Sequence, residues 1–322
     1  MAQGPDTQGP DTKGSSHAAE SHDTAAVASQ GQGVVLALLA TGMWALFPLA
    51  FKTVAHIDAL EVLAHRSAWA MLFAALFMLA MGRREIFSRA FYAPRLLGFL
   101  ALSAVAISVN WGVFIWAVAH DRVLESSLGY YINPLVSVAL GVVVLREHLS
   151  FANWVAIAFA VVGVAVFVWG RGAVPWVPLA LAFSWAIYGL VRKVAPVGSL
   201  PGLYLETLLL LPLAVGYVVW LAARGVGVFG GAFEDSVLLI VMGLLTALPL
   251  LLFARATRIL RLASIGLLMY IVPTGQFILA VFVFDEPFTS SHMLAFVLIW
   301  SGLAIYGWGA ARAGRRAVAS SR

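Results

Sequence analysis

The segment 134–169 recurs in this chain 139 positions later, and this repeat constrains the fold more than any other feature of the sequence. Four residue types match at that single offset: Pro134, Glu147, Gly163 and Trp169 with Pro273, Glu286, Gly302 and Trp308. The same offset places Asn110 on Pro249, and near the start of each copy an offset of 141 places Trp44 on Trp185. The chain is therefore one unit used twice.

The composition identifies the solvent of this repeated unit as lipid. Hydrophobic residues make up 62% of the chain and charged residues 11%, against roughly 25% charged in soluble proteins. The net charge of +5 does not indicate a nucleic-acid partner, because the basic residues lie in short runs between apolar segments. The absence of cysteine excludes disulfides, thiol catalysis and cysteine metal sites.

The sequence predicts an all-α integral membrane protein with ten transmembrane helices. Each apolar segment has the length of about 20 residues that a span requires. The predicted spans are 34–54, 60–81, 96–119, 125–145, 151–169, 174–191, 203–221, 236–256, 262–283 and 290–310. The first five fall in a first repeat (33–170) and the last five in a second (174–310). We expect residues 1–30 to form a disordered cytoplasmic tail and 311–322 a basic cytoplasmic tail.

The distribution of basic residues predicts the orientation. With the N-terminus inside, the inner segments hold 15 Lys and Arg residues and the outer segments 4. This bias places both termini in the cytoplasm of a multi-pass protein of the cell (cytoplasmic) membrane. Because five is odd, the two units enter the membrane in opposite directions, so the repeat is inverted. Inverted repeats allow two near-equivalent states, open to either side.

Prolines in the middle of spans indicate where a binding site would lie. Pro134 lies midway along the fourth span, Pro273 midway along the ninth and Pro249 near the middle of the eighth. A proline in a helix removes one backbone hydrogen bond, and in hydrocarbon the freed carbonyl needs another partner or a cavity. We expect helix breaks here at the membrane midplane, although prolines in membrane helices also form simple kinks.

Aromatic and amide side chains surround these prolines and suit a small amphipathic substrate or a cation. Packing between helices is the competing interpretation of each aromatic residue. The predicted substrate-binding residues are Trp44, Asn110, Trp111, Tyr131, Asn133, Tyr188, Tyr270 and Thr274, with Tyr130, Trp185 and Gln276 nearby.

Charged residues inside spans are functional candidates, because each costs about 2.5–3.5 kcal/mol to insert. Glu61, His65 and Arg66 lie together in the second span, and Glu206 is the approximate repeat partner of Glu61. Protons are therefore a candidate coupling ion, with these four residues as coupling groups. The alternative is structural, with Glu61 paired to Arg66 or Lys52.

Catalytic and cofactor motifs are missing from the sequence. It contains no phosphate-binding loop, no H-E-x-x-H and no G-x-S-x-G, and its histidines lack metal-ligand spacing. We predict no enzyme activity, no cofactor, no metal and no nucleic-acid partner. Small residues are dense in the fifth and tenth spans, where they could pack within a monomer or form a homodimer face.

Several strings resemble the RarD branch of the EamA family, in the drug/metabolite transporter (DMT) superfamily. They are ESSLGYYINPLVSVALGV (125–142), EVLAHRSAW (61–69), NWGVFIWAV (110–118), PWVPLALAFSWAIYGLVRK (175–193) and YIVPT (270–274). The resemblance runs from about residue 33 to 310 and implies two EamA repeats, a central cavity and secondary transport, mostly export, of small metabolites. Met269 departs from the branch, which tends to have Gln before the Tyr of the Y-I-x-P-T string.

The resulting prediction is a secondary active transporter that exports a small metabolite or drug-like molecule by alternating access, with the lipid bilayer as its surroundings. Two alternatives belong to other classes. An integral-membrane enzyme acting on a lipid or quinone would require a His or acidic cluster at one membrane face, and a membrane sensor or scaffold would normally add a soluble domain.

Overall fold

The computed structural model describes residues 30–82, 94–145, 151–172, 174–195, 197–260 and 262–320. Within these ranges the chain is helical and contains no strand. Ten helices are long and apolar enough to cross a membrane, which confirms the predicted fold class. Residues 1–29 of the predicted N-terminal tail lie outside the described residues.

The ten spans follow one another along the chain. The first span, Gln30–Lys52, is a helix over residues 30–45 followed by α2 (Phe47–Lys52). The next eight elements are α3 (Ala59–Ala80), α5 (Pro94–Ala119), α6 (Val123–Leu145), α7 (Phe151–Arg171), α8 (Trp176–Val194), α9 (Ser199–Ala223), α10 (Phe233–Ile259) and α11 (Leu262–Met269). They are followed by α12 (Ile271–Phe282), which completes the ninth span with α11, and by α13 (Ser290–Ser320).

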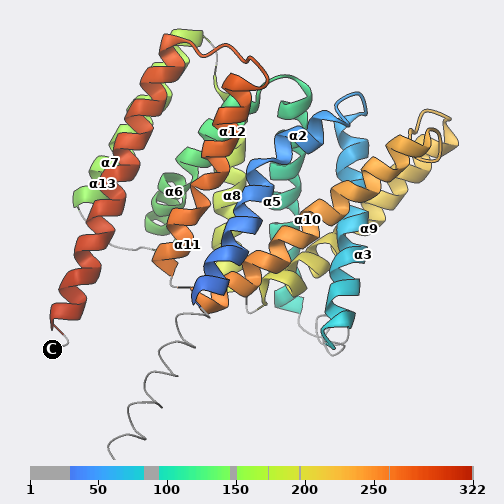
Figure 1. Cartoon of the computed structure of the whole chain (residues 1–322), viewed down its shortest axis with the longest axis horizontal. Helices are drawn as coiled ribbons and strands as arrows, with labels where there is room; N and C mark the ends of the chain where they lie inside the picture. The colour runs from blue at the N-terminus through green and yellow to red at the C-terminus, as the bar shows by residue number, and fades with distance from the viewer. Residues whose placement is uncertain are drawn as a thin grey trace, which may run out of the picture.

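Helices at equivalent places in the two halves pack against each other. The pairs are α3 with α9, α6 with α12 and α7 with α13. The α7–α13 pair lies at one end of the molecule and the α3–α9 pair at the other (Figure 1). The two halves therefore share one interior instead of forming separate domains.

Small residues allow the α7–α13 contact. A side chain at Gly163 would come within 3.2 Å of the Ala295 carbonyl oxygen, and one at Gly302 within 2.8 Å of the Ala156 carbonyl oxygen. Gly163 and Gly302 are repeat equivalents, so each half contributes one glycine to the close approach of the two helices. The small residues predicted to pack within the chain or between copies thus pack within the chain here.

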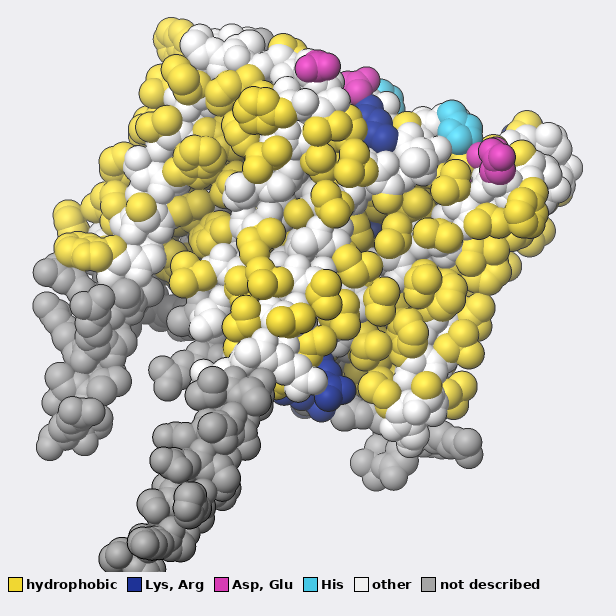
Figure 2. Space-filling model, in the orientation of Figure 1, with side chains coloured by type: hydrophobic (Ala, Val, Ile, Leu, Met, Phe, Trp, Pro, Cys, Tyr) yellow, Lys and Arg dark blue, Asp and Glu magenta, His cyan; other side chains and the backbone are white. Residues whose placement is uncertain are grey.

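The outer surface is that of a protein in lipid. Figure 2 shows a broad hydrophobic belt on the face in view, with Asp, Glu, His and some Lys or Arg atoms along its upper edge and a group of Lys and Arg at its lower edge. The hydrophobic side chains of the belt contact lipid without a desolvation cost. The charged side chains lie at the two ends of the spans, where they reach water. Asp58 begins α3 at the upper end, where its carboxylate accepts hydrogen bonds from the Leu60 and Glu61 amides at 2.9 and 3.3 Å.

Two spans are interrupted, and the positions differ in part from the prediction. The ninth span breaks at Tyr270, three residues before Pro273, and the first span breaks at Leu46, just before Pro48. In contrast, α6 runs through Pro134 and α10 runs through Pro249. A proline disturbs one turn by removing a donor, and packing by neighbouring helices is sufficient for the helix to continue.

Candidate functional site

A cavity of about 1040 Å³ lies between the two halves of the chain. Its walls come from the first span, α3, α5, α6, α8, α11, α12 and α13. The lining residues are Trp44, Phe47, Arg66, Asn110, Trp111, Phe114, Tyr130, Asn133, Pro134, Ser137, Trp185, Gly266, Leu267, Met269, Tyr270, Val272, Pro273, Gln276, Leu303, Ala304, Tyr306, Gly307 and Trp308. Such a volume suits a small molecule.

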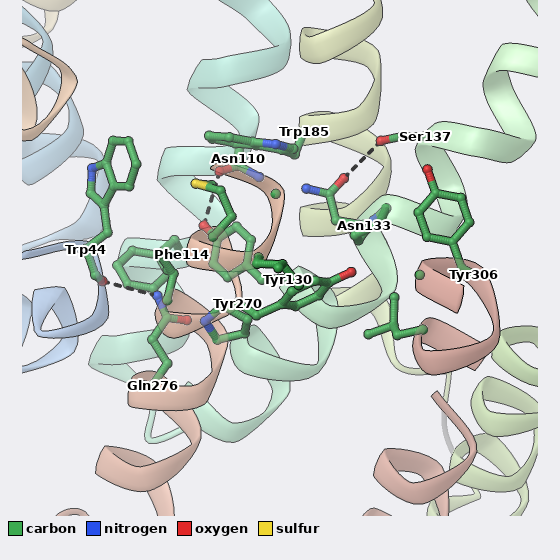
Figure 3. Close-up of a pocket in the computed structure, with 18 of the residues that line it drawn as sticks. Trp44, Asn110, Phe114, Tyr130, Asn133, Ser137, Trp185, Tyr270, Gln276 and Tyr306 are labelled. Carbon is green, nitrogen blue, oxygen red and sulfur yellow. Dashed lines mark hydrogen bonds between the residues drawn. The ribbon is translucent and has the colours of Figure 1, made fainter. Parts of the chain in front are cut away.

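Nine of the 23 residues that line the cavity are aromatic, and several of their rings appear in Figure 3. Trp44 of the first span and Trp185 of α8, which are repeat equivalents, lie on different sides of the space. Trp44 packs on Phe253, and Trp185 meets Tyr130 edge to face with ring centroids 6.4 Å apart. The indole and phenol rings therefore hold each other in place and present flat apolar surface to the cavity.

Amide side chains provide hydrogen-bonding groups among these rings. Asn110 is fully buried, and its amide nitrogen donates to the Leu181 carbonyl and the Ser184 hydroxyl at 3.0 and 3.1 Å. Its amide oxygen accepts from the Tyr130 hydroxyl at 3.2 Å, so Asn110 joins α5, α6 and α8 at the cavity wall. Asn133 has only a long contact of 3.5 Å from the Ser137 hydroxyl, which leaves most of its amide available to a ligand.

Gln276 brings a second amide from α12. Its nitrogen donates to the Trp44 carbonyl at 3.4 Å (Figure 3), whereas its Oε1 is buried without a hydrogen-bond partner. An unpaired buried acceptor is costly. A ligand that carries a donor would satisfy it.

Arg66 of α3 brings a positive charge to the cavity. Its side chain is 3% exposed, and its Nε donates to the Thr246 hydroxyl at 2.7 Å. The guanidinium carbon lies 4.4 Å from the centre of the Trp111 ring and 5.0 Å from that of Phe51. Cation–π contacts thus take the place of a carboxylate partner around this charge.

Most of the predicted substrate-binding residues meet at this cavity. Trp44, Asn110, Trp111, Asn133 and Tyr270 line it, as do Pro134 and Pro273. Tyr131, Thr274, Tyr188 and Pro249 are not among the lining residues. Substrate contact by any of these residues stays a prediction.

Tyr131 and Thr274 contact each other instead of the cavity. The Tyr131 hydroxyl lies 2.6 Å from the Thr274 Oγ1, and Tyr131 is 4% exposed. Ser127, one turn earlier on α6, donates to the carbonyl of Pro273 at 2.8 Å. These contacts join α6 to α12 beside the cavity.

The residues predicted for proton coupling lie in three different surroundings. Glu61 accepts a hydrogen bond from the Val228 amide at 2.8 Å, and His65 stacks on Phe229 with ring centroids 4.5 Å apart. These two residues thus hold the segment between α9 and α10. Glu61 does not take Lys52 as its partner, since Lys52 contacts Asp121.

Glu206 lies fully buried on α9, away from Glu61. It accepts from the Ser103 hydroxyl at 2.6 Å and from the Tyr188 hydroxyl at 3.4 Å, and Arg192 Nη1 lies 3.5 Å from its carboxylate. Tyr188 is therefore a partner of this carboxylate and not part of the cavity wall. Arg66 is the one member of the predicted coupling set that lines the cavity.

Several lining residues could not be recognised from the sequence. Phe47, Phe114 and Ser137 do not stand out in sequence among apolar and small neighbours, and Tyr306 lies near the middle of α13. Pro48 was a signal for the break in the first span that brings Phe47 to the wall. No group of three or more His, Cys, Asp or Glu side chains placed to hold a metal ion occurs in the part of the chain that the structure describes.

Comparison with known proteins agrees with this architecture. Residues 31–169 match the model of the EamA-like transporter family. The chain is 43% identical over 288 residues to the protein RarD of Streptomyces exfoliatus, covering 89% of this chain and 91% of that protein. It is 39% identical over 288 residues to an uncharacterized transporter of Vibrio cholerae, covering 89% and 95%.

A solved crystal structure shares the fold. It superposes with a TM-score of 0.56 at 17% identity, covering 86% of this chain and 97% of the other. The relatives extend over nearly the whole chain at identities that establish common membership. This multi-pass membrane protein therefore belongs to the EamA-like transporter family, in the RarD branch of the drug/metabolite transporter superfamily.

Proposed function

We propose that this protein is a secondary active transporter that exports a small metabolite or drug-like molecule across the cytoplasmic membrane by alternating access. The observation that carries the proposal is the 1040 Å³ cavity, whose walls come from both halves of the chain. A site built from both halves changes shape when they move against each other, as alternating access requires.

The cavity has one closed end, which supports a conformation open to one side. At the end of the spans near residues 52–58 and 118–124, the helices pack tightly around side chains that are between 0 and 3% exposed: Phe51, Val54, Ile57, Val118, Val123 and Leu124. Glu286 adds to this closure from the segment after α12, because its carboxylate accepts from the Val123 and Leu124 amides at 2.6 and 2.8 Å.

The opposite end of the cavity is lined by α11 and the middle of α13, including Gly266, Leu267, Tyr306 and Trp308. These segments lead toward the inner segments of the chain, which together hold 15 of the 20 Lys and Arg residues. By the charge rule that side is cytoplasmic. We therefore assign the structure to a state open to the cytoplasm, from which an exporter loads its substrate.

The proposed exchange between states rests on the two repeats being inverted. The repeat-related pairs α3–α9, α6–α12 and α7–α13 support this relationship, since each half places the same helix against its counterpart. Proton coupling is part of the proposal, and Glu206 is the residue whose surroundings support it best. A fully buried carboxylate between Ser103, Tyr188 and Arg192 is a site where protonation would rearrange several contacts.

The first test identifies the substrate and then measures its movement. Metabolites are compared in the medium and in cells that contain or lack the protein, and the molecules that differ are offered to inside-out vesicles. We expect Asn133→Ala to reduce uptake into the vesicles at unchanged protein level, because Asn133 lines the cavity. Leu213→Ala on the lipid face of α9, where Leu213 is 74% exposed, is the matched control and should transport normally. Equal rates in all three proteins would exclude the cavity as the pathway.

A further inference from the structure

The charge of the cavity wall restricts the class of molecule that the cavity accepts. Among the described residues that line it, Arg66 alone carries a formal charge, and every other lining residue is apolar, aromatic or an uncharged polar residue. A cationic ligand in this space would meet a fixed positive charge in surroundings of low dielectric constant. Aromatic walls alone would favour cations, so Arg66 reverses the preference.

Arg66 is held in place but is not neutralised. Its Nε bonds to Thr246, and its Nη1 is buried without a hydrogen-bond partner. The Phe47, Phe51 and Trp111 rings surround the guanidinium carbon at 5.7, 5.0 and 4.4 Å from their centres. This packing fixes the orientation of the planar group and leaves a donor pointing at no protein acceptor.

The acidic side chains of the neighbouring helices are engaged elsewhere. Glu61, five residues before Arg66 on α3, bonds to the Val228 amide. Glu206 pairs with Arg192, and Glu125 of α6 pairs with Arg122 at 3.0 Å. The protein therefore does not supply an anion to Arg66 from these positions.

A buried guanidinium without a counter-ion carries a large desolvation cost, which an anion in the same site offsets. We propose that the cavity binds a small organic monoanion, an aromatic or otherwise apolar carboxylate, whose carboxylate pairs with Arg66 while its body packs on the rings of Trp44, Trp185 and Tyr270. Arg66 supplies one positive charge, which balances a monoanion, whereas a phosphate dianion would leave one negative charge uncompensated among lining residues that carry no other charge. This inference names the substrate class of the proposed transport site and rests on that proposal for its physiological meaning.

The test compares three ligands of one shape and different charge. Full-length protein in lipid nanodiscs is titrated with 3-phenylpropionate, 3-phenylpropionamide and 3-phenylpropylamine, and binding is measured calorimetrically. We expect the acid to bind about 10- to 100-fold more tightly than the amide, as a charge-assisted bond to arginine implies, and the amine to bind least. Tighter or equal binding of the amide or the amine, or no binding of the acid, overturns the inference.

Variants of Arg66 test whether this residue causes the preference for the acid over the amide. Arg66→Gln keeps a donor for Thr246 but removes the charge, and the acid should lose its advantage over the amide. Arg66→Lys should retain part of it. Arg224→Gln is the matched control, since it removes one positive charge from the end of α9, where Arg224 stacks over Trp220, and should leave the preference unchanged. If Arg66→Gln does not fold, the three-ligand comparison on the native chain still decides.

The anion-binding proposal and the transport proposal can be contradicted independently of each other. Acid-selective binding together with an absence of flux for every molecule offered to vesicles would support the site and contradict the transport proposal. Flux of neutral or cationic molecules without acid-selective binding would support transport and contradict the anion site.

Discussion

Tyr131 and Tyr270 stack on each other with ring centroids 6.4 Å apart and their planes 19° from parallel. They are equivalent positions of the repeat, 139 residues apart, so the stack joins the two halves through one residue type. Their surroundings differ, because Tyr270 lines the cavity and Tyr131 is buried against Thr274. Under alternating access these two environments would be exchanged, with Tyr131 at the cavity in the opposite state.

The open and closed ends of the cavity should differ in how fast an introduced cysteine reacts with a thiol reagent. The chain has no cysteine, so single substitutions report without background. We expect Tyr270→Cys to react with a membrane-impermeant thiol reagent in inside-out vesicles, because Tyr270 lines the cavity and the proposed state is open to the cytoplasm. Val123→Cys, at the closed end where Val123 is fully buried, should be protected from the reagent on both sides. Reaction of Val123→Cys at the rate of Tyr270→Cys would contradict the closed end.

The contact between α7 and α13 predicts a steric effect at Gly302. The Cβ of Gly302→Ala would lie 2.8 Å from the Ala156 carbonyl oxygen, which is backbone and cannot rotate away. We expect a loss of about 1–3 kcal/mol of stability, as for other overpacked sites, measured by thermal unfolding in detergent. Gly216→Ala on α9 has no heavy atom within 4 Å of the new Cβ and should melt at or above the native temperature.

The change from Glu to Gln should affect transport coupling at Glu206 and stability at Glu61. Glu206→Gln should make transport independent of the proton gradient, because it removes the carboxylate between Ser103 and Arg192. Glu61→Gln should lower the melting temperature and leave the gradient dependence intact, since Glu61 accepts from the Val228 amide. Substrate flux is measured with and without a protonophore. Flux in the native protein that ignores the protonophore would rule out proton coupling.

Glu286 predicts a pH-dependent contribution to stability. Burial raises the pKa of its carboxyl, while the Leu124 and Val123 amides act against that shift. When the folded-state pKa lies above the unfolded value, the residue's contribution to the free energy of unfolding is fully present below the unfolded pKa. This contribution is lost as pH rises through the raised pKa. The melting temperature of the native protein relative to Glu286→Gln should therefore be higher at pH 5 than at pH 8. A difference that does not change with pH, or grows toward pH 8, would contradict this.

Hydropathy was sufficient to predict the ten spans, but it does not determine which face of each helix meets the cavity. Hydropathy depends only on local composition, so ten helices could be predicted directly. Trp44 and Trp185 both line the cavity as the repeat suggests. Tyr131 and Tyr270 do not behave alike, because conformation and not sequence equivalence decides their exposure. Arg66 could be recognised as unusual, but the rings around it come from two other helices, α2 and α5.

The bond between Glu61 and the Val228 amide has a consequence for synthesis, since 167 residues separate the two partners. When α3 enters the bilayer, neither Val228 nor the helices on either side of it have been made. The carboxylate therefore inserts before the amide that donates to it exists, and it must be kept hydrated or protonated until α9 and α10 arrive. We therefore expect translation speed and the insertion machinery to influence how much correctly assembled protein a cell obtains.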